Sequence, residues 1–169
     1  GETGFLPVEI CGPPTLCGSM PTAILDSSTS SQFTSGLLLA APCMPEGLRI
    51  ELLGDVVSRP YLDMTASVMS AFGAEVLMPD DRTFVVAPSG YRSVDYRVEP
   101  DASAASYFFA LAAICGGTVR VKGLSADSLH GDVGFVNVLQ NMGAVVLFES
   151  DAITVTGAPL HGVTVDFSQ

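Results

Sequence analysis

The feature that most constrains this chain is an internal repeat, in which the same succession of patterns returns after about seventy residues. The aligned segments are residues 31–34 with 106–109, Ser58 with Ser128, 71–76 with 141–146, and 84–86 with 153–155. Common short repeats hold about 20–50 residues, so a unit of this length has room for several helices and strands. The repeat therefore predicts two similar structural units in succession.

Hydrophobic periodicity gives the order of elements within the first unit. It predicts strands over residues 22–25 and 48–53, helices over 30–41 and 60–72, and a hairpin formed by 75–78 and 83–86. The second of these helices is amphipathic, and Gly73 is placed to end it.

The second unit repeats this order. Strands are predicted over residues 93–98 and 118–122, helices over 102–114 and 132–142, and a hairpin over 144–148 with 153–156. Each copy is therefore expected to be a β-α-β-α-β-β unit, which makes the chain an α/β (α+β) protein.

The first helix of each unit is apolar on nearly all sides, over residues 35–41 and 108–114. Such helices are usually buried on more than one side, so we expect them to lie inside a ring of sheets from several units. Residues 7–10 resemble the closing strand of a preceding unit, and residues 162–167 resemble the opening strand of a following one. We therefore expect this chain to be an internal piece of a longer protein.

Charge restricts the class of partner. Seven Lys and Arg residues oppose eighteen Asp and Glu residues, which gives a net charge of −11. Such a surface repels nucleic acids and anionic membranes, and no apolar run reaches the roughly 18 residues of a membrane helix. It also repels phosphorylated metabolites, unless cations are focused at one spot or supplied from outside the chain. The N-terminus lacks a signal-peptide pattern, and we expect a folded cytoplasmic protein.

The cysteines do not predict a metal site, because they form no C-x-x-C pair and only two histidines are present. No metal or other cofactor is therefore expected. Cys43 and Cys115 lie in or beside apolar helical stretches and are predicted to be buried thiols. Cys11 and Cys17 lie in a loop rich in Gly and Pro, where both reduced thiols and a disulfide stay open.

Candidate binding residues gather at the starts of the two helices of the first unit. Ser30, Ser31 and Gln32 begin the first helix, where hydroxyl and free N–H groups can bind an anion with the help of the helix dipole. Ser58 and Tyr61 begin the second helix. The alternative interpretation is that the serines only cap their helices.

Arg59 adds a planar, fork-shaped cation at the start of the second helix, and Pro60 suits the first turn of that helix. The two helix starts could converge on one phosphate, with Arg59 as its cation. The alternative is a solvated surface charge.

Other catalytic interpretations fail on spacing. The glycines before Asp55 and Asp132 are turn signals, because no G-x-x-x-x-G-K sequence follows a strand. His130 and His161 lie in turn regions without a G-x-S-x-G elbow, which argues against Ser/His/Asp catalysis. Asp101 follows a proline and is predicted to cap the helix after it.

Taken together, four segments resemble the 5-enolpyruvylshikimate-3-phosphate synthase family. They are Ser30-Ser31-Gln32-Phe33, Ser58-Arg59-Pro60-Tyr61, Glu99-Pro100-Asp101-Ala102, and Gly131-Asp132-Val133-Gly134-Phe135 with Met142-Gly143-Ala144. Their order and spacing hold over essentially the whole chain after about residue 5. The Gly-rich stretch often found early in this region of the family is replaced by residues 11–18, so that loop is expected to differ.

The resemblance implies an inside-out α/β barrel type of fold, with two globular halves of three units each and substrates in the cleft between them. Residues 1–97 would belong to the first, upper half and residues 98–169 to the second, lower half. The implied activity is that of a transferase in chorismate and aromatic amino-acid biosynthesis. It moves the enolpyruvyl group of phosphoenolpyruvate to the 5-hydroxyl of shikimate 3-phosphate and releases phosphate.

The resemblance assigns shikimate 3-phosphate binding to Ser30, Ser31, Gln32, Ser58 and Tyr61, and it assigns no catalytic residue to this chain. The family's acid–base aspartate and its phosphate-binding cations match no residue here, so the isolated 169-residue chain is expected to be inactive and to need the rest of its parent chain. Two alternatives are a transferase acting on UDP-N-acetylglucosamine, which shares the fold, and a non-catalytic domain that binds ligands or partners. The run Ser30-Ser31-Gln32 with Ser58 argues against the UDP-sugar enzyme.

Overall fold

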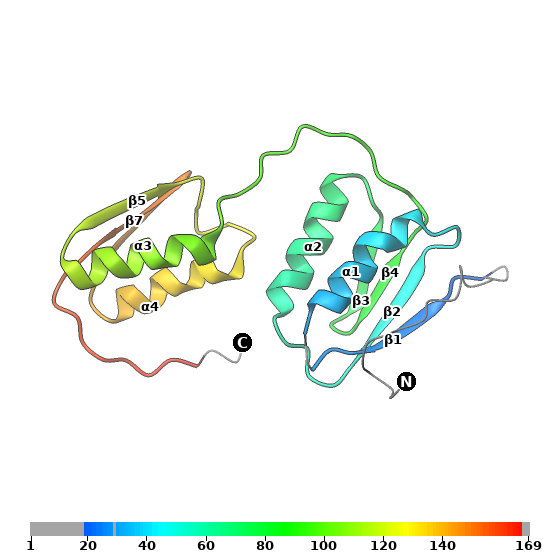
Figure 1. The fold of residues 1–169 in the computed structure, drawn as a ribbon, viewed down its shortest axis with the longest axis horizontal. Coiled ribbons are helices and arrows are strands. Elements are labelled where there is room, and N and C mark those ends of the chain that lie inside the picture. Colours follow the sequence, from blue (N-terminus) through cyan, green and yellow to red (C-terminus); the bar gives the residue numbers. More distant parts are fainter. Residues whose placement is uncertain (1–18, 29, 167–169) are drawn as a thin grey trace, which may run out of the picture.

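Each half of the chain folds as helices packed on one face of a sheet, with an irregular segment over residues 87–101 joining the halves (Figure 1). The structure is a computed structural model that describes residues 19–28 and 30–166. The predicted mixed α/β class is confirmed. In the part of the chain that is described, no helix is both long and apolar enough to cross a membrane.

The first unit contains four strands and two α-helices. Its elements are β1 Thr22–Asp26, α1 Gln32–Ala40, a 3₁₀ turn η1 Ala41–Cys43, β2 Leu48–Leu53, α2 Arg59–Ala71, β3 Val76–Asp80 and β4 Thr83–Val86. The sheet order is β1-β2-β4-β3. β1 and β2 are parallel, whereas the other pairs are antiparallel.

The core of the first unit lies between α1, α2 and the central strands. Leu38 and Leu62 from the two helices meet Ile50 of β2 and Phe84 of β4, and all four are fully buried. Burying each such side chain stabilises the fold by about 1.5–3 kcal/mol. Gly73 has a φ of +86° just after α2, which is the helix-ending conformation predicted for it.

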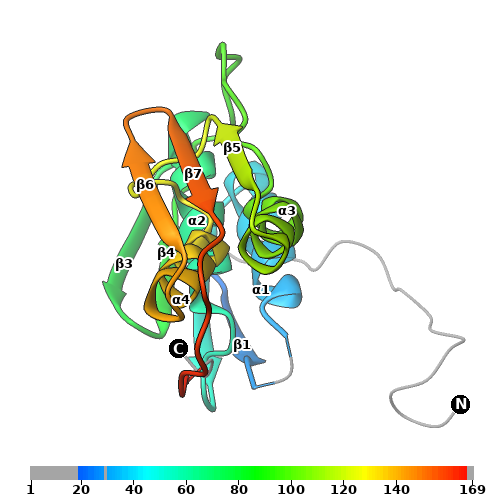
Figure 2. The ribbon, with the colours of Figure 1, turned by 90° about the vertical axis from the view of Figure 1, so that its left-hand side faces the viewer.

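The second unit repeats the arrangement of β2, β4 and β3, and its own strands β5, β7 and β6 lie side by side in Figure 2. Its elements are α3 Ala102–Cys115, β5 Thr118–Lys122, a 3₁₀ turn η2 Gly131–Gly134, α4 Phe135–Asn141, β6 Val145–Glu149 and β7 Ala152–Thr156. The order β5-β7-β6 matches β2-β4-β3, and its pairs are also antiparallel. The predicted helix over 132–142 begins as a 3₁₀ turn, and its α-helical part is shorter than expected.

The opening strand of the second unit is not formed, so the prediction of a strand over residues 93–98 is wrong. The alternating pattern does indicate a segment with two different faces, but this segment packs against the first unit instead of pairing as a strand. Tyr96 packs against Phe72, which directly follows α2, with ring centroids 5.4 Å apart, and the N–H of Arg92 donates to the Phe72 carbonyl. Residues 162–166 of the predicted final strand are also irregular. The strand expected over residues 7–10 lies outside the described residues.

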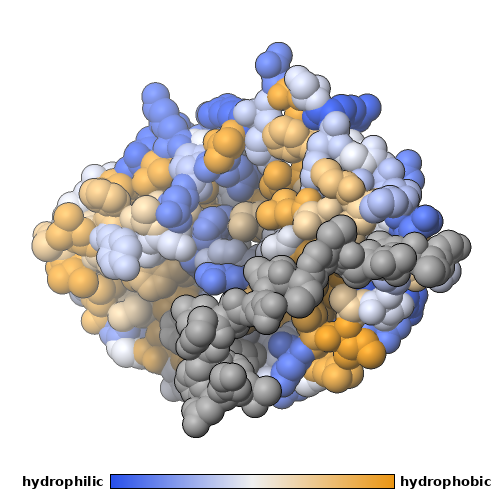
Figure 3. Space-filling view, turned by 45° about the vertical axis from the view of Figure 1, so that its right-hand side comes forward, coloured by the Kyte–Doolittle hydropathy of each residue, from blue (hydrophilic) through white to orange (hydrophobic). Residues whose placement is uncertain are grey.

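The apolar helices each keep an uncovered side in this chain. On α3, Tyr107 and Ile114 are 77% and 76% exposed, and Phe33 of α1 is 67% exposed. Apolar side chains also lie among polar ones on the molecular face drawn in Figure 3. Burial of these helices on more than one side is therefore not reached within the described residues, and the surrounding ring of sheets stays a prediction.

The prediction of buried thiols is wrong, because Cys43 and Cys115 are both exposed. Cys43 ends the 3₁₀ turn that follows α1, and Cys115 ends α3 next to the exposed Ile114. An apolar neighbourhood in the sequence does not guarantee burial at the end of a helix. Cys11 and Cys17 lie outside the described residues.

Candidate functional site

The two candidate helix starts are brought to one edge of the first sheet by parallel strand pairing. Asp26, the last residue of β1, stands opposite Leu53, the last residue of β2. Parallel neighbours end on the same side, so the loops leading to α1 and α2 leave the sheet together. Further along these helices, the hydroxyls of Ser35 and Thr65 lie 3.1 Å apart. The two helix starts therefore follow loops at the same sheet edge, and their convergence on one phosphate stays a prediction.

Ser27 joins the two loops. Its hydroxyl donates to the Leu53 carbonyl at 3.0 Å, and the Asp55 carbonyl lies 3.4 Å away. Its backbone carbonyl accepts from the N–H of Val57 at 3.4 Å. Because Ser27 is buried and fully used in these contacts, its role is to fix the loops rather than to bind a ligand.

At the start of α1, the three predicted residues have different environments. The hydroxyl of Ser30 accepts from the N–H of Gln32 at 3.2 Å, so it serves partly as a local cap. Ser31 holds the N-cap position and is nearly buried, but within the described residues its hydroxyl accepts no capping hydrogen bond. Gln32 is exposed. The capping interpretation thus holds for Ser30 and fails for Ser31.

At the start of α2, Ser58 has an unusual backbone. Its φ of +55° is left-handed, and among the described residues it is the one non-glycine with a positive φ. This conformation costs a side-chain-bearing residue about 1–2 kcal/mol. The Ser58 hydroxyl makes no capping bond to the described part of the helix, although the residue holds the N-cap position. Uncompensated strain of this kind gathers at functional sites.

Arg59 makes its hydrogen bonds within the first unit. Its Nε donates to the Asp63 carboxylate at 2.8 Å, and a terminal nitrogen donates to the Asp81 carbonyl at 2.5 Å. The guanidinium also lies over the Phe84 ring at 5.7 Å. Neither predicted role for Arg59 is present, because it is neither a solvated charge nor a cation directed at the serines.

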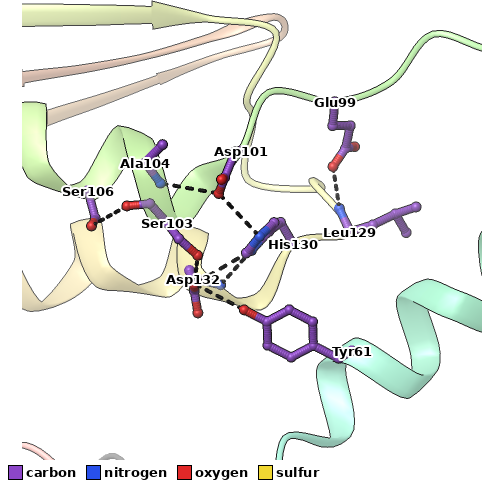
Figure 4. Close-up of polar contacts among 9 residues, drawn as sticks. All are labelled: Tyr61, Glu99, Asp101, Ser103, Ala104, Ser106, Leu129, His130 and Asp132. Atoms are coloured by element: carbon purple, nitrogen blue, oxygen red, sulfur yellow. Dashed lines mark hydrogen bonds and ion pairs between the residues drawn. The ribbon is translucent and has the colours of Figure 1, made fainter. Parts of the chain in front are cut away.

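Tyr61 points from α2 toward Asp132 of the second unit (Figure 4). Its hydroxyl donates to Asp132 at 3.4 Å, and its ring stands edge-on to His130 with centroids 5.6 Å apart. Gly131 makes room for this approach, since a Cβ at that position would lie 2.8 Å from Pro60. Tyr61 therefore lies where the two units meet.

A polar cluster of the second unit surrounds this meeting point. The Asp101 carboxylate caps α3 by accepting from the N–H of Ala104 at 3.2 Å, as predicted, and lies 3.6 Å from His130 Nε2. The Ser103 hydroxyl donates to Asp132, and His130 Nδ1 accepts from the N–H of Asp132 at 3.4 Å. The sequence indicates a turn and a family-like segment at Gly131 and Asp132, but no contact with Tyr61, because nothing in their spacing links them to it.

The electrostatics of the site edge are acidic. The hydroxyl and N–H of Ser28 both donate to Asp26 and hold the pKa of that carboxyl below its ordinary value of 3.8, so it is charged near neutral pH. Among the described residues, no group of three His, Cys, Asp or Glu side chains is arranged to hold a metal ion. The site therefore offers hydroxyl, amide and helix N–H groups, which can bind anionic or polyol oxygens but cannot neutralise them.

Comparison with solved structures identifies the class of fold. The enolpyruvyl transferase NikO from Streptomyces tendae matches with a TM-score of 0.57 at 19% identity, over 82% of this chain and 35% of that one. At this identity the likeness concerns the fold alone.

Sequence comparison then identifies the family. The model of the family EPSP synthase (3-phosphoshikimate 1-carboxyvinyltransferase) matches residues 1–169, and the chain belongs to this family. It is 48% identical over 151 residues to the 3-phosphoshikimate 1-carboxyvinyltransferase of Edwardsiella ictaluri, covering 85% of this chain and 34% of the relative. It is 45% identical over 171 residues to the enzyme of that name from Methanoculleus marisnigri, covering 99% and 39% respectively. The chain thus spans little more than a third of the length of these relatives.

Proposed function

We propose that this chain is part of an enzyme that transfers the enolpyruvyl group of phosphoenolpyruvate to the 5-hydroxyl of shikimate 3-phosphate and releases phosphate. Within it, Ser30, Ser31, Gln32, Ser58 and Tyr61 bind shikimate 3-phosphate. Family membership supports the reaction, and the position of the two helix starts at one sheet edge supports the location.

One observation carries the binding role: Ser31 and Ser58 occupy N-cap positions without capping their helices in the described structure. Serines are favoured at such positions because their oxygen accepts a helix N–H, and a missing cap costs about 0.5–2 kcal/mol. Ser58 also keeps a strained left-handed backbone. Hydroxyls that forgo this stabilisation stay available as hydrogen-bond donors to a ligand.

The proposed substrates demand more positive charge than this site contains. Arg59 is held by Asp63 and Asp81, and Asp26 adds a negative charge at the edge. We therefore infer that the cations binding the phosphates and the groups performing acid–base catalysis come from outside these 169 residues. Protonating the methylene group of phosphoenolpyruvate requires a positioned general acid.

The same proposal accounts for the exposed apolar helices. Further β-α-β-α-β-β units would cover α1 and α3 in an inside-out barrel arrangement, with residues 1–97 in one globular half and 98–169 in the other. The substrates would bind between the halves. The complete enzyme is expected to be cytoplasmic and to need no cofactor.

The test is Ser31→Ala in the complete enzyme. Each hydrogen bond to a charged oxygen contributes roughly 1.5–3 kcal/mol, so the affinity for shikimate 3-phosphate should fall about tenfold or more. The melting temperature should stay unchanged, because Ser31 makes no cap for the variant to lose. Calorimetric titration and thermal unfolding on one sample measure both effects. A drop of melting temperature with unchanged affinity would reduce Ser31 to a structural residue.

The 169-residue polypeptide by itself should not release phosphate from the two substrates, and it should bind shikimate 3-phosphate weakly. Phosphate release that depends on both substrates, measured on the pure polypeptide, would show that the missing cations and acid are not needed. Micromolar affinity of the polypeptide for shikimate 3-phosphate would likewise contradict the need for outside cations.

A further inference from the structure

Asp132 is the point at which three helix starts of the two units are joined. Its carboxylate accepts hydrogen bonds from Tyr61 of α2 and from Ser103 of α3, while its own N–H donates to His130 Nδ1 (Figure 4). Asp132 itself lies in η2, which leads into α4. The carboxylate is therefore held from the second unit while it contacts the first.

His130 strengthens this arrangement from the other side. Its side chain is only 14% exposed, and its Nδ1 accepts from the Asp132 N–H, which leaves the ring proton on Nε2 facing Asp101 at 3.6 Å. Asp101 is in turn fixed as the cap of α3. The ring edge contact with Tyr61 then limits where the phenol can lie.

This geometry decides the hydrogen-bonding polarity of Tyr61. A phenol has one proton to donate, and a carboxylate can only accept. When Tyr61 donates to Asp132, its oxygen presents only lone pairs to any further partner. A phosphate dianion presents acceptors and would be repelled by the adjacent carboxylates, whereas an alcohol can donate to the phenolic oxygen.

We propose that Asp132 is a positioning residue that holds Tyr61 as a hydrogen-bond acceptor for a ring hydroxyl of the substrate, and not as a donor to its phosphate. This inference rests on the proposed function, because it assumes that Tyr61 lines the shikimate 3-phosphate site. It assigns the second unit a direct part in recognition by the first. Asp132 acts through Tyr61 and need not touch the substrate itself.

The first experiment compares three probes on Tyr61→Phe in the complete enzyme. Shikimate represents the hydroxyl-bearing ring, inorganic phosphate represents the charged group, and shikimate 3-phosphate carries both. Loss of one hydrogen bond should weaken shikimate and shikimate 3-phosphate binding by the same factor, about three- to tenfold, and leave phosphate binding unchanged. Competition titrations extended to millimolar concentrations measure all three. A loss confined to the two phosphate-bearing probes, or no loss at all, overturns the proposal.

The second experiment uses the matched pair Asp132→Asn and Asp132→Ala, which remove the same charge but differ in the acceptor. The asparagine side chain can still accept a hydrogen bond from the phenol. Adding Tyr61→Phe to Asp132→Asn should therefore weaken the binding of shikimate and of shikimate 3-phosphate by the same factor, as in the unmodified enzyme. In Asp132→Ala the phenol is free to donate to the phosphate. Adding Tyr61→Phe to this variant should therefore weaken the binding of shikimate 3-phosphate more than the binding of shikimate. Equal costs in both backgrounds would mean that Asp132 does not set the polarity of Tyr61.

Two controls separate the possible failures. Asp151→Ala removes a carboxylate that pairs with Arg97 at 3.3 Å in the β6–β7 turn, and it should change none of the three affinities. Thermal unfolding identifies any variant that is merely misfolded. If Asp132→Ala does not fold, the role of Asp132 can still be tested with Asp132→Asn. If the unmodified enzyme fails to bind shikimate 3-phosphate, the proposed function fails as well. If it binds but the Tyr61→Phe pattern is wrong, only this inference fails.

Discussion

The starts of the helices differ between the two units in a way that the repeat alone does not predict. In the second unit, Asp101 caps α3 with its carboxylate, and the turn serine Ser128 accepts the N–H of Ser125 at 3.0 Å. In the first unit, the N-cap serines Ser31 and Ser58 make no cap within the described residues. One copy of the unit thus uses its loop side chains for stability, whereas the other leaves two of them unused.

The two units also differ by one strand. β1 lies parallel to β2 and delivers two loops to one sheet edge, whereas in the second unit no described strand pairs with β5 on the side away from β7. In the second unit, the segment at the start of α3 packs against η2, and Asp101 and Ser103 make structural contacts there. The two copies of the unit therefore differ both in the opening strand and in the contacts made by their loop side chains.

The largest effect is expected when the matched serines, Ser58 and Ser128, are each replaced by alanine. In the complete enzyme, Ser58→Ala should weaken shikimate 3-phosphate binding by roughly 1.5–3 kcal/mol and leave the free energy of unfolding almost unchanged. Ser128→Ala should do the reverse and lower stability by about 1 kcal/mol, because it leaves the Ser125 N–H without its acceptor. Titration measures the affinity of both variants, and urea unfolding measures their stability. Similar changes of affinity and stability in the two variants would contradict a functional difference between the units.

Removing the cap of the second unit should give the next largest effect. Asp101→Ala deprives the Ala104 N–H of its acceptor and should lower the free energy of unfolding by about 1 kcal/mol. Asp101→Asn keeps the cap and should recover most of this stability. Urea unfolding of the 169-residue chain is the measurement. An Asn variant as unstable as the Ala variant would mean that the contact of Asp101 with His130, and not the cap, carries the effect.

Relaxing the strained backbone of the first unit should produce a smaller gain. Glycine tolerates the left-handed conformation of Ser58, so Ser58→Gly should raise the free energy of unfolding by about 0.5–1 kcal/mol. The gain is partly offset because glycine gains flexibility in the unfolded chain. The same variant should lose affinity as Ser58→Ala does. Lower stability of Ser58→Gly would mean that the backbone is not strained as its φ indicates.

The smallest effect concerns acid stability of the second sheet. Arg120 donates two hydrogen bonds to Glu149 and holds the pKa of that carboxyl below its ordinary value of 4.5. Protonation therefore favours the unfolded chain, so this contribution is complete above pH 4.5 and is lost as pH falls through the lowered folded pKa. Glu149→Gln should show a slightly flatter decline of melting temperature between pH 5 and pH 3, as measured by thermal scans. A steeper decline would mean that folding raises the pKa of Glu149 instead of lowering it.

Much of the fold was predictable because it depends on local pattern. The strands β2 and β5 begin and end where the alternation predicts, and Gly73 ends α2 as its position indicates. The strand over residues 93–98 was mispredicted because strand formation needs a partner, and the partner side of β5 is not occupied by it. Alternation records which faces are apolar but not which neighbour is present.

The candidate site was predictable in its residues but not in their contacts. The spacing placed Ser31 and Ser58 at helix starts, yet only the backbone of Ser58 reveals that it cannot act as an ordinary cap. Arg59 was misjudged because its partners, Asp63 and Asp81, compete for the guanidinium at short distance. The contact of Tyr61 with Asp132 joins residues far apart in sequence, and no local pattern carries that information.

The position of β5 at the end of its sheet has a consequence for the behaviour of the polypeptide in concentrated solution. An edge strand presents backbone groups to which a second molecule can add, and such addition leads to aggregation. Along β5, Arg120 and Lys122 alternate with Val119 and Val121, so two cations stand on a strand that would otherwise be strongly adhesive. Charged side chains on an edge deter pairing between copies. We therefore expect two of the seven cations of this acidic chain to limit pairing between copies, which makes them poor choices for replacement when the protein is engineered.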